Sequence, residues 1–144
     1  MKQISQVTFS FQKAATLKER KRLKQFISLI FKENKQELDM LQYIFCGDDE
    51  ILRVNRQYLE HDYYTDIITF DLREKLAEPM MADIFISVDT VRSNARLLNE
   101  PFFRELHRVI FHGALHLCGF NDKTAEEQQV MRRKEDEYLI RYGF

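Results

Sequence analysis

The sequence predicts an α+β fold in which one small mixed sheet of about four strands packs with about five helices. Two observations predict this class. Short β-branched and aromatic segments alternate with amphipathic segments in the first two thirds of the chain, whereas only helical patterns follow in the last third. The chain has 144 residues, of which 44% are hydrophobic, so we expect a single domain over residues 1–144 with a sizeable core.

The chain opens with a predicted strand and an amphipathic helix. Residues 3–10 alternate loosely between apolar and polar side chains, as a strand does. Thr16 and Glu19 have the spacing of a capping box, in which two side chains satisfy backbone amides at the start of a helix. We therefore expect a helix over residues 17–34, whose apolar positions recur at helical spacing: Leu23, Phe26, Ile27, Ile30 and Phe31.

The middle of the chain predicts three more strands and one helix. Residues 39–46 are mainly apolar and suit a strand. Asp48 can cap the helix that follows, whose expected inner face is formed by Ile51, Val54, Asn55 and Tyr58. Residues 66–71 and 82–87 are β-branched and aromatic and predict two strands, joined by a loop that contains Pro79.

Three helices complete the predicted fold. The first ends before Pro101, because a residue that precedes proline avoids the helical conformation, and its apolar face is Val91, Ala95 and Leu98. Pro101 suits the first turn of the next helix, which we expect to reach about Leu117 and to end at Gly119. Thr124 and Glu127 form a second capping box that opens a polar C-terminal helix.

Composition excludes several classes of protein. The formal net charge is −1, so the chain as a whole does not attract nucleic acid, and we interpret the basic runs at residues 18–24 and 132–134 as solvated helix faces. Two cysteines are too few for a disulfide-stapled secreted domain. The most apolar run, Val109–Phe120, is shorter than the roughly 20 residues that a bilayer requires. We expect a cytoplasmic protein that does not enter a membrane.

The segment from His112 to Asp122 carries the predicted chemistry. His112 and His116 are four residues apart, so on a helix they share one face, with Cβ atoms about 5–6 Å apart. Gly119 ends the helix and permits a reversal that returns Asp122 to the same face. Two imidazoles and one carboxylate are ligands that zinc accepts. We therefore predict a metal site formed by His112, His116 and Asp122, with one coordination position open for catalysis.

The alternative interpretation is that these histidines are ordinary core residues. The helix has an apolar stripe, so we expect it to be largely buried, and buried imidazoles without a partner are costly: the stripe is Leu106, Val109, Ile110, Gly113 and Leu117. A metal ion supplies that partner. Cys118 and His107 should point away from the ligand face, Cys118 as a packing residue, and His61 should lie in a loop.

The spacing of these residues parallels that of a protease site. The pattern H-x₃-H-x₂-G-x₂-D matches the metzincin pattern H-E-x-x-H-x-x-G-x-x-H up to the last ligand. In those proteases the residue after the first histidine is the glutamate that acts as general base. Here that residue is Gly113, which cannot take up a proton, so peptide hydrolysis by that mechanism is disfavoured.

The segment HGALHLCGFND is similar to the motif H-G-x-L-H-L-x-G-[YF]-D-H of the YbeY-type rRNA-maturation endoribonucleases. The likeness spans residues 40–142 and includes family motif positions at Asn55, Tyr58, residues 65–70, residues 82–87, Met131 and Glu135. It implies an α+β, zincin-like fold with the metal-site helix in the C-terminal third and one zinc ion. It also implies action on single-stranded RNA in rRNA maturation and ribosome quality control, with ribosomal or assembly-factor proteins as partners.

Two residues depart from the motifs of that family. Asp122 stands where the family has a third histidine, which lowers the formal charge of the site by one and weakens its pull on phosphate. Leu59 stands where the family has an arginine after Tyr58, a residue expected to bind phosphate charge. We hypothesise that Arg56, one turn earlier on the same helix, replaces that arginine; the alternative is that Arg56 is an ordinary surface charge.

The catalytic groups other than the metal stay unknown from the sequence. Metal-assisted cleavage of a phosphodiester needs a base for water or for the ribose 2′-hydroxyl, and Asp66, Asp71 and Glu105 are candidates by chemistry alone; the favoured interpretation is that each is structural. Three alternative functions remain open. These are a ribosome-assembly RNA-binding factor with a structural metal, a metal-dependent peptidase or amidase, and, with least support, an iron oxygenase. Transition metals other than zinc are also open.

Overall fold

The computed structural model describes residues 6–59 and 65–144 and confirms the predicted α+β class, a mixed four-stranded sheet with five helices. The strands are β1 (Val7–Phe11), β2 (Leu38–Cys46), β3 (Ile67–Asp71) and β4 (Met80–Ser87). The helices are α1 (Arg20–Glu33), α2 (Asp48–Leu59), α3 (Val88–Leu97), α4 (Phe102–Leu117) and α5 (Ala125–Tyr142). No helix in these described parts combines the length and apolar character needed to cross a membrane.

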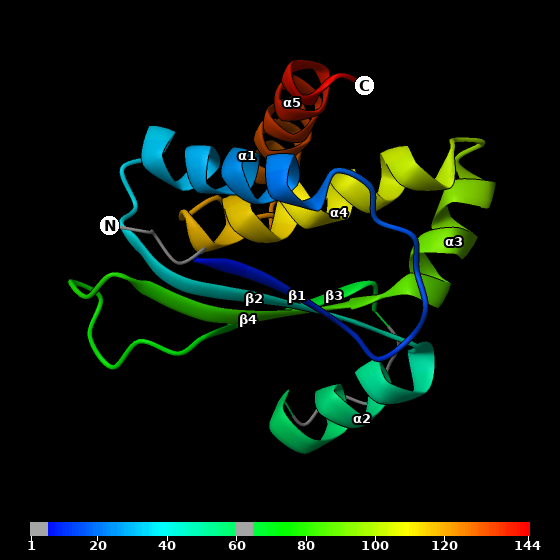
Figure 1. The fold of residues 1–144 in the computed structure, drawn as a ribbon, viewed down its shortest axis with the longest axis horizontal. Coiled ribbons are helices and arrows are strands. Elements are labelled where there is room, and N and C mark those ends of the chain that lie inside the picture. Colours follow the sequence, from blue (N-terminus) through cyan, green and yellow to red (C-terminus); the bar gives the residue numbers. More distant parts are fainter. Residues whose placement is uncertain (1–5, 60–64) are drawn as a thin grey trace.

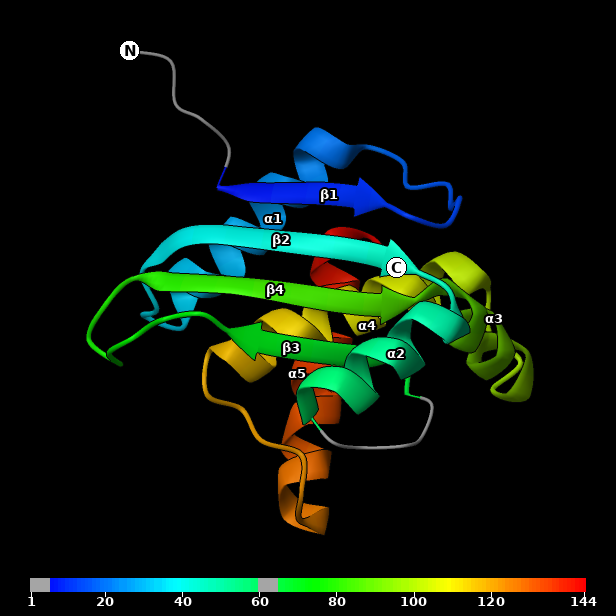
Figure 2. The ribbon, with the colours of Figure 1, turned by 90° about the horizontal axis from the view of Figure 1, so that it is seen from below.

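The sheet places the predicted metal-site helix beside an edge strand. The strand order is β1-β2-β4-β3, with β1, β2 and β4 parallel and β3 antiparallel to β4 (Figure 2). Helices α1 and α4 cover one face of the sheet, and α2 lies on the opposite face (Figure 1). Helix α4 contacts both β3 and β4. Because β3 is the edge strand, the side of α4 next to β3 lies at the edge of the sheet.

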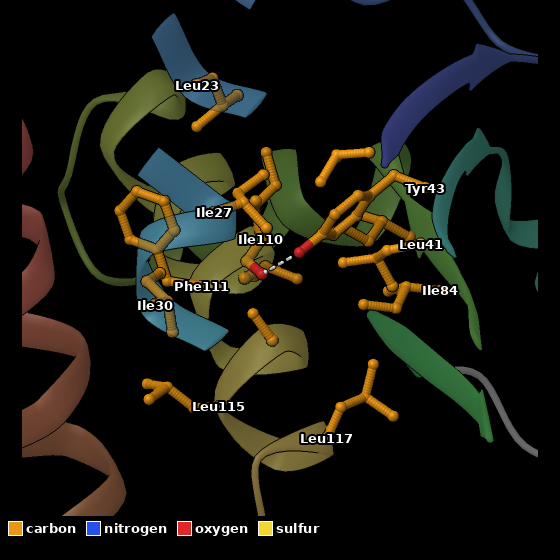
Figure 3. Close-up of a cluster of buried hydrophobic side chains, with 14 of the residues drawn as sticks. Leu23, Ile27, Ile30, Leu41, Tyr43, Ile84, Ile110, Phe111, Leu115 and Leu117 are labelled. Atoms are coloured by element: carbon orange, nitrogen blue, oxygen red, sulfur yellow. Dashed lines mark hydrogen bonds between the residues drawn. The ribbon is translucent and has the colours of Figure 1, made fainter. Parts of the chain in front are cut away.

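The main core lies between α1, α4 and the sheet (Figure 3). Its one polar member on β2, Tyr43, is fully buried, and burial raises the pKa of its hydroxyl well above the ordinary value. That hydroxyl donates a hydrogen bond of 2.8 Å to the backbone carbonyl of Ile110 on α4. Because a buried hydroxyl without a partner is costly, this bond sets where α4 lies along the sheet.

Gly113 lets α4 come unusually close to the sheet. A Cβ atom at this position would lie 2.9 Å from Cδ1 of Ile67 on β3 and 3.0 Å from Cδ1 of Ile84 on β4. Any larger side chain would have to displace both isoleucines. Close packing against the sheet thus explains why the residue after His112 is glycine.

Two predicted helix starts differ from the structure in their detail. The capping box at Thr16 and Glu19 is wrong: Glu19 is itself the N-cap residue of α1, has a left-handed backbone (φ 51°) and makes no capping side-chain bond within the described residues. Pro101 likewise precedes α4 as its N-cap residue instead of lying in the first turn. The capping box of Thr124 and Glu127 at the start of α5 is confirmed, with both reciprocal bonds present.

The expected inner face of α2 is correct in part. Ile51, Val54 and Asn55 are buried, but Tyr58 is 60% exposed and Leu52 is buried instead. The ring of Tyr58 rests edge-on against Phe70 of β3, which lets it cover the sheet while remaining in contact with solvent. Residues 3–5 of the first predicted strand and His61 lie outside the described residues.

The early basic run is a solvated helix face, as predicted. Arg20, Arg22 and Lys24 extend over the rings of Phe11, Tyr142 and Phe9 respectively, with cation-to-ring distances of 4.5, 4.0 and 5.5 Å. Their apolar stems and charges thus cover one buried and two partly buried aromatic rings around α1.

A partly exposed ion-pair cluster joins α1 to α5. Arg141 donates two hydrogen bonds to the two carboxylate oxygens of Glu33, at 2.7 and 2.6 Å, and the hydroxyl of Tyr138 donates a third at 2.9 Å. The hydrogen bonds from Arg141 lower the pKa of Glu33 to about 2, against partial burial. The folded state therefore favours ionised Glu33 more strongly than the unfolded chain does.

We expect Glu33→Gln to lower the free energy of unfolding at neutral pH by roughly 1 kcal/mol, after allowance for solvent screening of a pair that is about one third exposed. A depressed pKa contributes stability above the unfolded pKa, near 4.3, and this contribution is lost as the pH falls through about 2. Urea unfolding at neutral pH and near pH 2 should thus show the difference between wild type and variant shrinking on acidification.

Glu137→Gln provides the matched control on α5, because its carboxylate is only within 3.9 Å of Lys134. It should leave the unfolding free energy nearly unchanged at both pH values. A Glu33→Gln deficit that is the same at neutral pH and near pH 2 would contradict the assignment.

Candidate metal centre

A pocket of about 620 Å³ opens between β3, α4 and α5 and contains all three predicted metal ligands. It is lined by charged and imidazole side chains: Asp66, Glu105, Arg108, His112, His116, Asp122, Arg132 and Glu135. The remaining lining residues are Thr65, Ile67, Thr69, Val109, Gln128 and Met131. The site thus combines residues from three elements that are separated in the sequence.

His112 has a defined orientation at the centre of this pocket. Its Nδ1 lies 2.6 Å from Oε2 of Glu135 and its Nε2 lies 3.3 Å from Oδ2 of Asp122. The Glu135 carboxylate can only accept, so Nδ1 of His112 donates to it, and Nε2 faces the carboxylate of Asp122. Burial disfavours the charged ring, but the hydrogen bond and charge of Glu135, with smaller effects of Asp122 and Asp66, outweigh it and raise the pKa of His112.

His116 lies one helical turn beyond His112 and lines the same pocket, as the spacing predicted. The expectation that both imidazoles are buried is wrong for His116, which is exposed. The reason is that α4 ends at Leu117, so the outer side of its last turn is open to solvent. An exposed imidazole is hydrated and free to rotate, and burial therefore gives no argument for a metal at this residue.

The chain reverses after α4 as predicted. Gly119 has φ +103°, a conformation that favours glycine, and the following residues return Asp122 to within 3.3 Å of His112. Gln128 of α5 donates a hydrogen bond of 3.0 Å to the backbone carbonyl of Asp122, which supports the returning segment. The carboxylate of Asp122 remains 43% exposed and accessible from the pocket.

The donors fit a divalent ion in their chemistry and partly in their arrangement. Two ligands that are each about 2.0–2.1 Å from a tetrahedral zinc lie roughly 3.3 Å apart, and Nε2 of His112 and Oδ2 of Asp122 have this separation. A metal-binding histidine also commonly donates its other N–H to a carboxylate, as His112 does to Glu135. Within residues 6–59 and 65–144, no three His, Cys, Asp or Glu side chains converge closely enough to hold a metal as they stand.

His116 decides whether this pair becomes a three-ligand site. The exposed imidazole of His116 would have to rotate toward His112 and Asp122 to complete it. The ligand set His112, His116 and Asp122 therefore stays a prediction.

Glu135 is the pocket residue whose contact with His112 the sequence did not reveal. Its Oε1 accepts a hydrogen bond of 3.1 Å from Arg108, while its Oε2 accepts from His112. Arg108 also donates to Asp136 at 2.7 Å. Arg108 and Glu135 are both buried, so they neutralise each other inside the protein. The position of Glu135 at a family motif was the one signal available in the sequence, and it did not indicate a contact with His112.

Two of the three candidate bases lie in the pocket. Burial raises the pKa of Asp66 and the pKa of Glu105, and Oε2 of Glu105 finds no hydrogen-bond partner among the described residues. Asp71 instead pairs with Arg73 at 2.7 Å, a hydrogen bond that lowers its pKa, and it does not line the described pocket. Asp66 and Glu105 are therefore the carboxyl groups that can hold a proton near the predicted ligands.

The other residues singled out in the sequence lie away from the ligands. His107 is buried against Tyr142 and Phe144 and bonds to the carbonyl of Phe103, so it is a core residue. Cys118 is half-buried against the core, and burial raises its pKa to about 12, as expected for a packing residue.

Arg56 and Leu59 belong to α2, on the sheet face opposite α4 (Figure 1), and neither is among the described residues that line the pocket. The structure thus does not bring Arg56 to the predicted ligands. Its proposed role in binding phosphate stays a prediction.

Comparison with known proteins agrees with the resemblance seen in the motifs. The sequence model described as Endoribonuclease YbeY matches residues 6–143. The chain is 60% identical over 99 residues to Endoribonuclease YbeY of Phocaeicola vulgatus, covering 69% of this chain and 70% of that protein. It is 47% identical over 123 residues to Endoribonuclease YbeY of Cytophaga hutchinsonii, covering 85% of each.

A solved structure agrees with the fold. The solution structure of a Thermotoga maritima protein superposes with a TM-score of 0.63 at 30% sequence identity, covering 92% of this chain and 86% of that one. The family match covers nearly the whole chain, including all three elements that form the pocket. The chain therefore belongs to the YbeY family of endoribonucleases.

Proposed function

We propose that this protein is a metal-dependent endoribonuclease that cleaves single-stranded RNA during rRNA maturation and ribosome quality control in the cytoplasm. In this proposal one zinc ion is held by His112, His116 and Asp122. The observation that carries it is the position of His112, held by Glu135 on one side and facing Asp122 on the other inside the pocket. Family membership supports RNA as the substrate.

The size of the pocket supports a single strand as substrate. A volume of about 620 Å³ suits a segment no larger than a small ligand. A flexible strand can present one nucleotide and its phosphate to such a pocket, whereas a duplex holds its bases stacked inside a helix. Ribosomal or assembly-factor proteins would then guide the enzyme to its site on rRNA.

The chain's own residues supply orientation and proton transfer. When bound, a zinc ion would supply Lewis-acid stabilisation of charge that develops on the phosphate. Glu135 keeps Nδ1 of His112 as the donor and so directs Nε2 into the pocket. Asp66 and Glu105, whose pKa values are raised by burial, can hold or release a proton at a carboxyl oxygen near the scissile phosphate.

The packing of Gly113 argues against the peptidase alternative. In metzincins this position supplies the general base. Here Ile67 and Ile84 fill the space into which a side chain at residue 113 would project, as close as 2.9 Å from an ideal Cβ. A glutamate at this position would point into the sheet and could not reach a water molecule in the pocket.

We expect His116→Ala to lose bound zinc and to lower RNA cleavage by at least about 100-fold, because it removes one of three ligands. The variant should remain folded, since His116 is exposed. Elemental analysis, thermal unfolding and a cleavage assay with a chelator control measure these effects.

The ends of the wild-type cleavage products identify the nucleophile. Products with a 2′,3′-cyclic phosphate would identify the ribose oxygen, and a 5′-phosphate would identify water.

Lys123→Ala is the matched control, because Lys123 is exposed and adjacent to Asp122 but does not line the described pocket. It should retain zinc and activity. Cleavage and zinc content that survive in His116→Ala would refute the ligand set. A folded His116→Ala that keeps RNA binding and loses cleavage would refute the alternative of an RNA-binding assembly factor with a structural metal.

The contact between Glu135 and His112 yields a separate prediction. We expect Glu135→Gln to weaken zinc binding by about 10- to 100-fold, because the amide is a poorer acceptor for Nδ1–H of His112. It should also destabilise the metal-free protein by about 2–3 kcal/mol, because it leaves the buried Arg108 with only one carboxylate. Zinc titration against a chromophoric chelator and urea unfolding measure the two effects.

Asp136→Asn separates the two effects. It removes the other carboxylate that pairs with Arg108 but does not touch His112. It should therefore lower stability while leaving zinc affinity within about twofold of wild type. Equal losses of zinc affinity in both variants would show that Glu135 acts only through stability.

A further inference from the structure

The pocket is lined by more carboxyl groups than guanidinium groups. Four carboxylates line it, those of Asp66, Glu105, Asp122 and Glu135, against the two guanidinium groups of Arg108 and Arg132. An RNA strand brings a further negative charge with each phosphate. Binding of RNA to this pocket therefore requires cations that are free to contact phosphate, and two arginines are available by position.

Arg108 is already committed to the protein interior. It is 4% exposed, and it donates hydrogen bonds to Glu135 at 3.1 Å and to Asp136 at 2.7 Å. The Nε–H of Arg108 has no partner among the described residues, but it is buried. Because the two Nη groups are held by Glu135 and Asp136, a phosphate could contact Arg108 only by opening this buried cluster, which is costly. Arg108 thus neutralises the pocket wall and does not bind the strand.

Arg132 differs from Arg108 in each of these respects. It is exposed, and the described part of the chain gives it no ion pair within 4.0 Å. Four residues of α5 line the pocket at spacings of three and four and so form one helical face: Gln128, Met131, Arg132 and Glu135. Glu135 on this face reaches His112, so Arg132 stands one helical turn from the residue that orients a predicted ligand.

The positive charge of Arg132 acts on the carboxyl group of Glu105 in the pocket. Burial raises the pKa of Glu105, and among the charges around that carboxyl Arg108 and Arg132 act in the opposite direction. Arg132 and Glu105 line the same pocket, and Arg132 remains accessible to solvent.

We propose that Arg132 is the residue that binds the RNA phosphate in this pocket. Leu59 carries no charge for this role, and Arg56 lies on α2, on the opposite face of the sheet. A guanidinium offers two parallel N–H donors to phosphate oxygens, and it stays charged at every physiological pH. This assignment rests on the proposed function, since it places the scissile strand in the pocket. It makes α5, not α2, the helix that holds the substrate.

The test measures RNA affinity separately from cleavage. The full chain, kept in a chelator so that no cleavage occurs, is titrated into fluorescently labelled single-stranded RNA oligonucleotides of several sequences at a series of salt concentrations. Arg132→Ala should weaken binding about tenfold for every sequence, and should reduce the slope of log affinity against log salt by about 0.7. With zinc restored, the same variant should raise KM more than it lowers kcat.

Arg133→Ala is the matched control, because Arg133 is the exposed neighbour on α5 but points about 100° away and does not line the described pocket. It should change affinity less than twofold and leave the salt slope unaltered. Arg132→Lys should keep the salt slope of wild type and recover part of the affinity, because it restores the charge without the paired donors.

The assignment is overturned if Arg132→Ala and Arg133→Ala have the same affinity and the same salt slope. It is also overturned if Arg132→Ala weakens binding to one RNA sequence only, which would indicate contact with a base. Failure of the proposed function has a different signature: wild-type protein that binds RNA but never cleaves it with any divalent metal.

Discussion

The carboxylate of Glu135 is the contact on which the rest of the site depends. One oxygen accepts from His112 and the other from Arg108, so a single buried group of α5 holds two residues of α4 that lie one helical turn apart. A buried carboxylate is tolerated only when such partners compensate its charge. The relative position of α4 and α5, the ring orientation of His112 and the commitment of Arg108 thus follow from one group.

Local features of the sequence were sufficient to predict most of the fold. The helical periodicity before Gly119, the left-handed glycine itself and the capping box at Thr124 act over a few residues, and each appears in the structure as expected. The return of Asp122 toward His112 belongs to the same group, because it depends only on where α4 ends. The number of strands and the mixed character of the sheet were also predicted, whereas their order, β1-β2-β4-β3, depends on pairing between distant segments and was not.

The features that sequence reasoning missed depend on contacts between distant residues. Glu135 and His112 are 23 residues apart, and no spacing within α5 alone shows which of its faces meets α4. The capping box at Thr16 failed because Glu19 takes a left-handed conformation where the chain enters α1. His116 was expected to be buried because its neighbours in the sequence are apolar, but it lies on the solvent side of the last turn of α4, whereas Leu115 and Leu117 of the same turn are buried. Arg132 belongs to a basic run that the sequence predicts to be a solvated helix face, and only the folded structure shows that it lines the pocket.

The hydrogen bond from Tyr43 to the carbonyl of Ile110 has a consequence for substrate selection. Sliding α4 along the sheet would leave this hydroxyl without a partner in the core, at a cost of about 1–3 kcal/mol. The hydrogen bond therefore restrains the wall of the pocket that carries His112. The segment of residues 119–124, in contrast, is mostly exposed and has few packing contacts of this kind to restrain it. Adjustment to RNA strands of different shape therefore costs less in this exposed segment than in the pocket wall formed by α4.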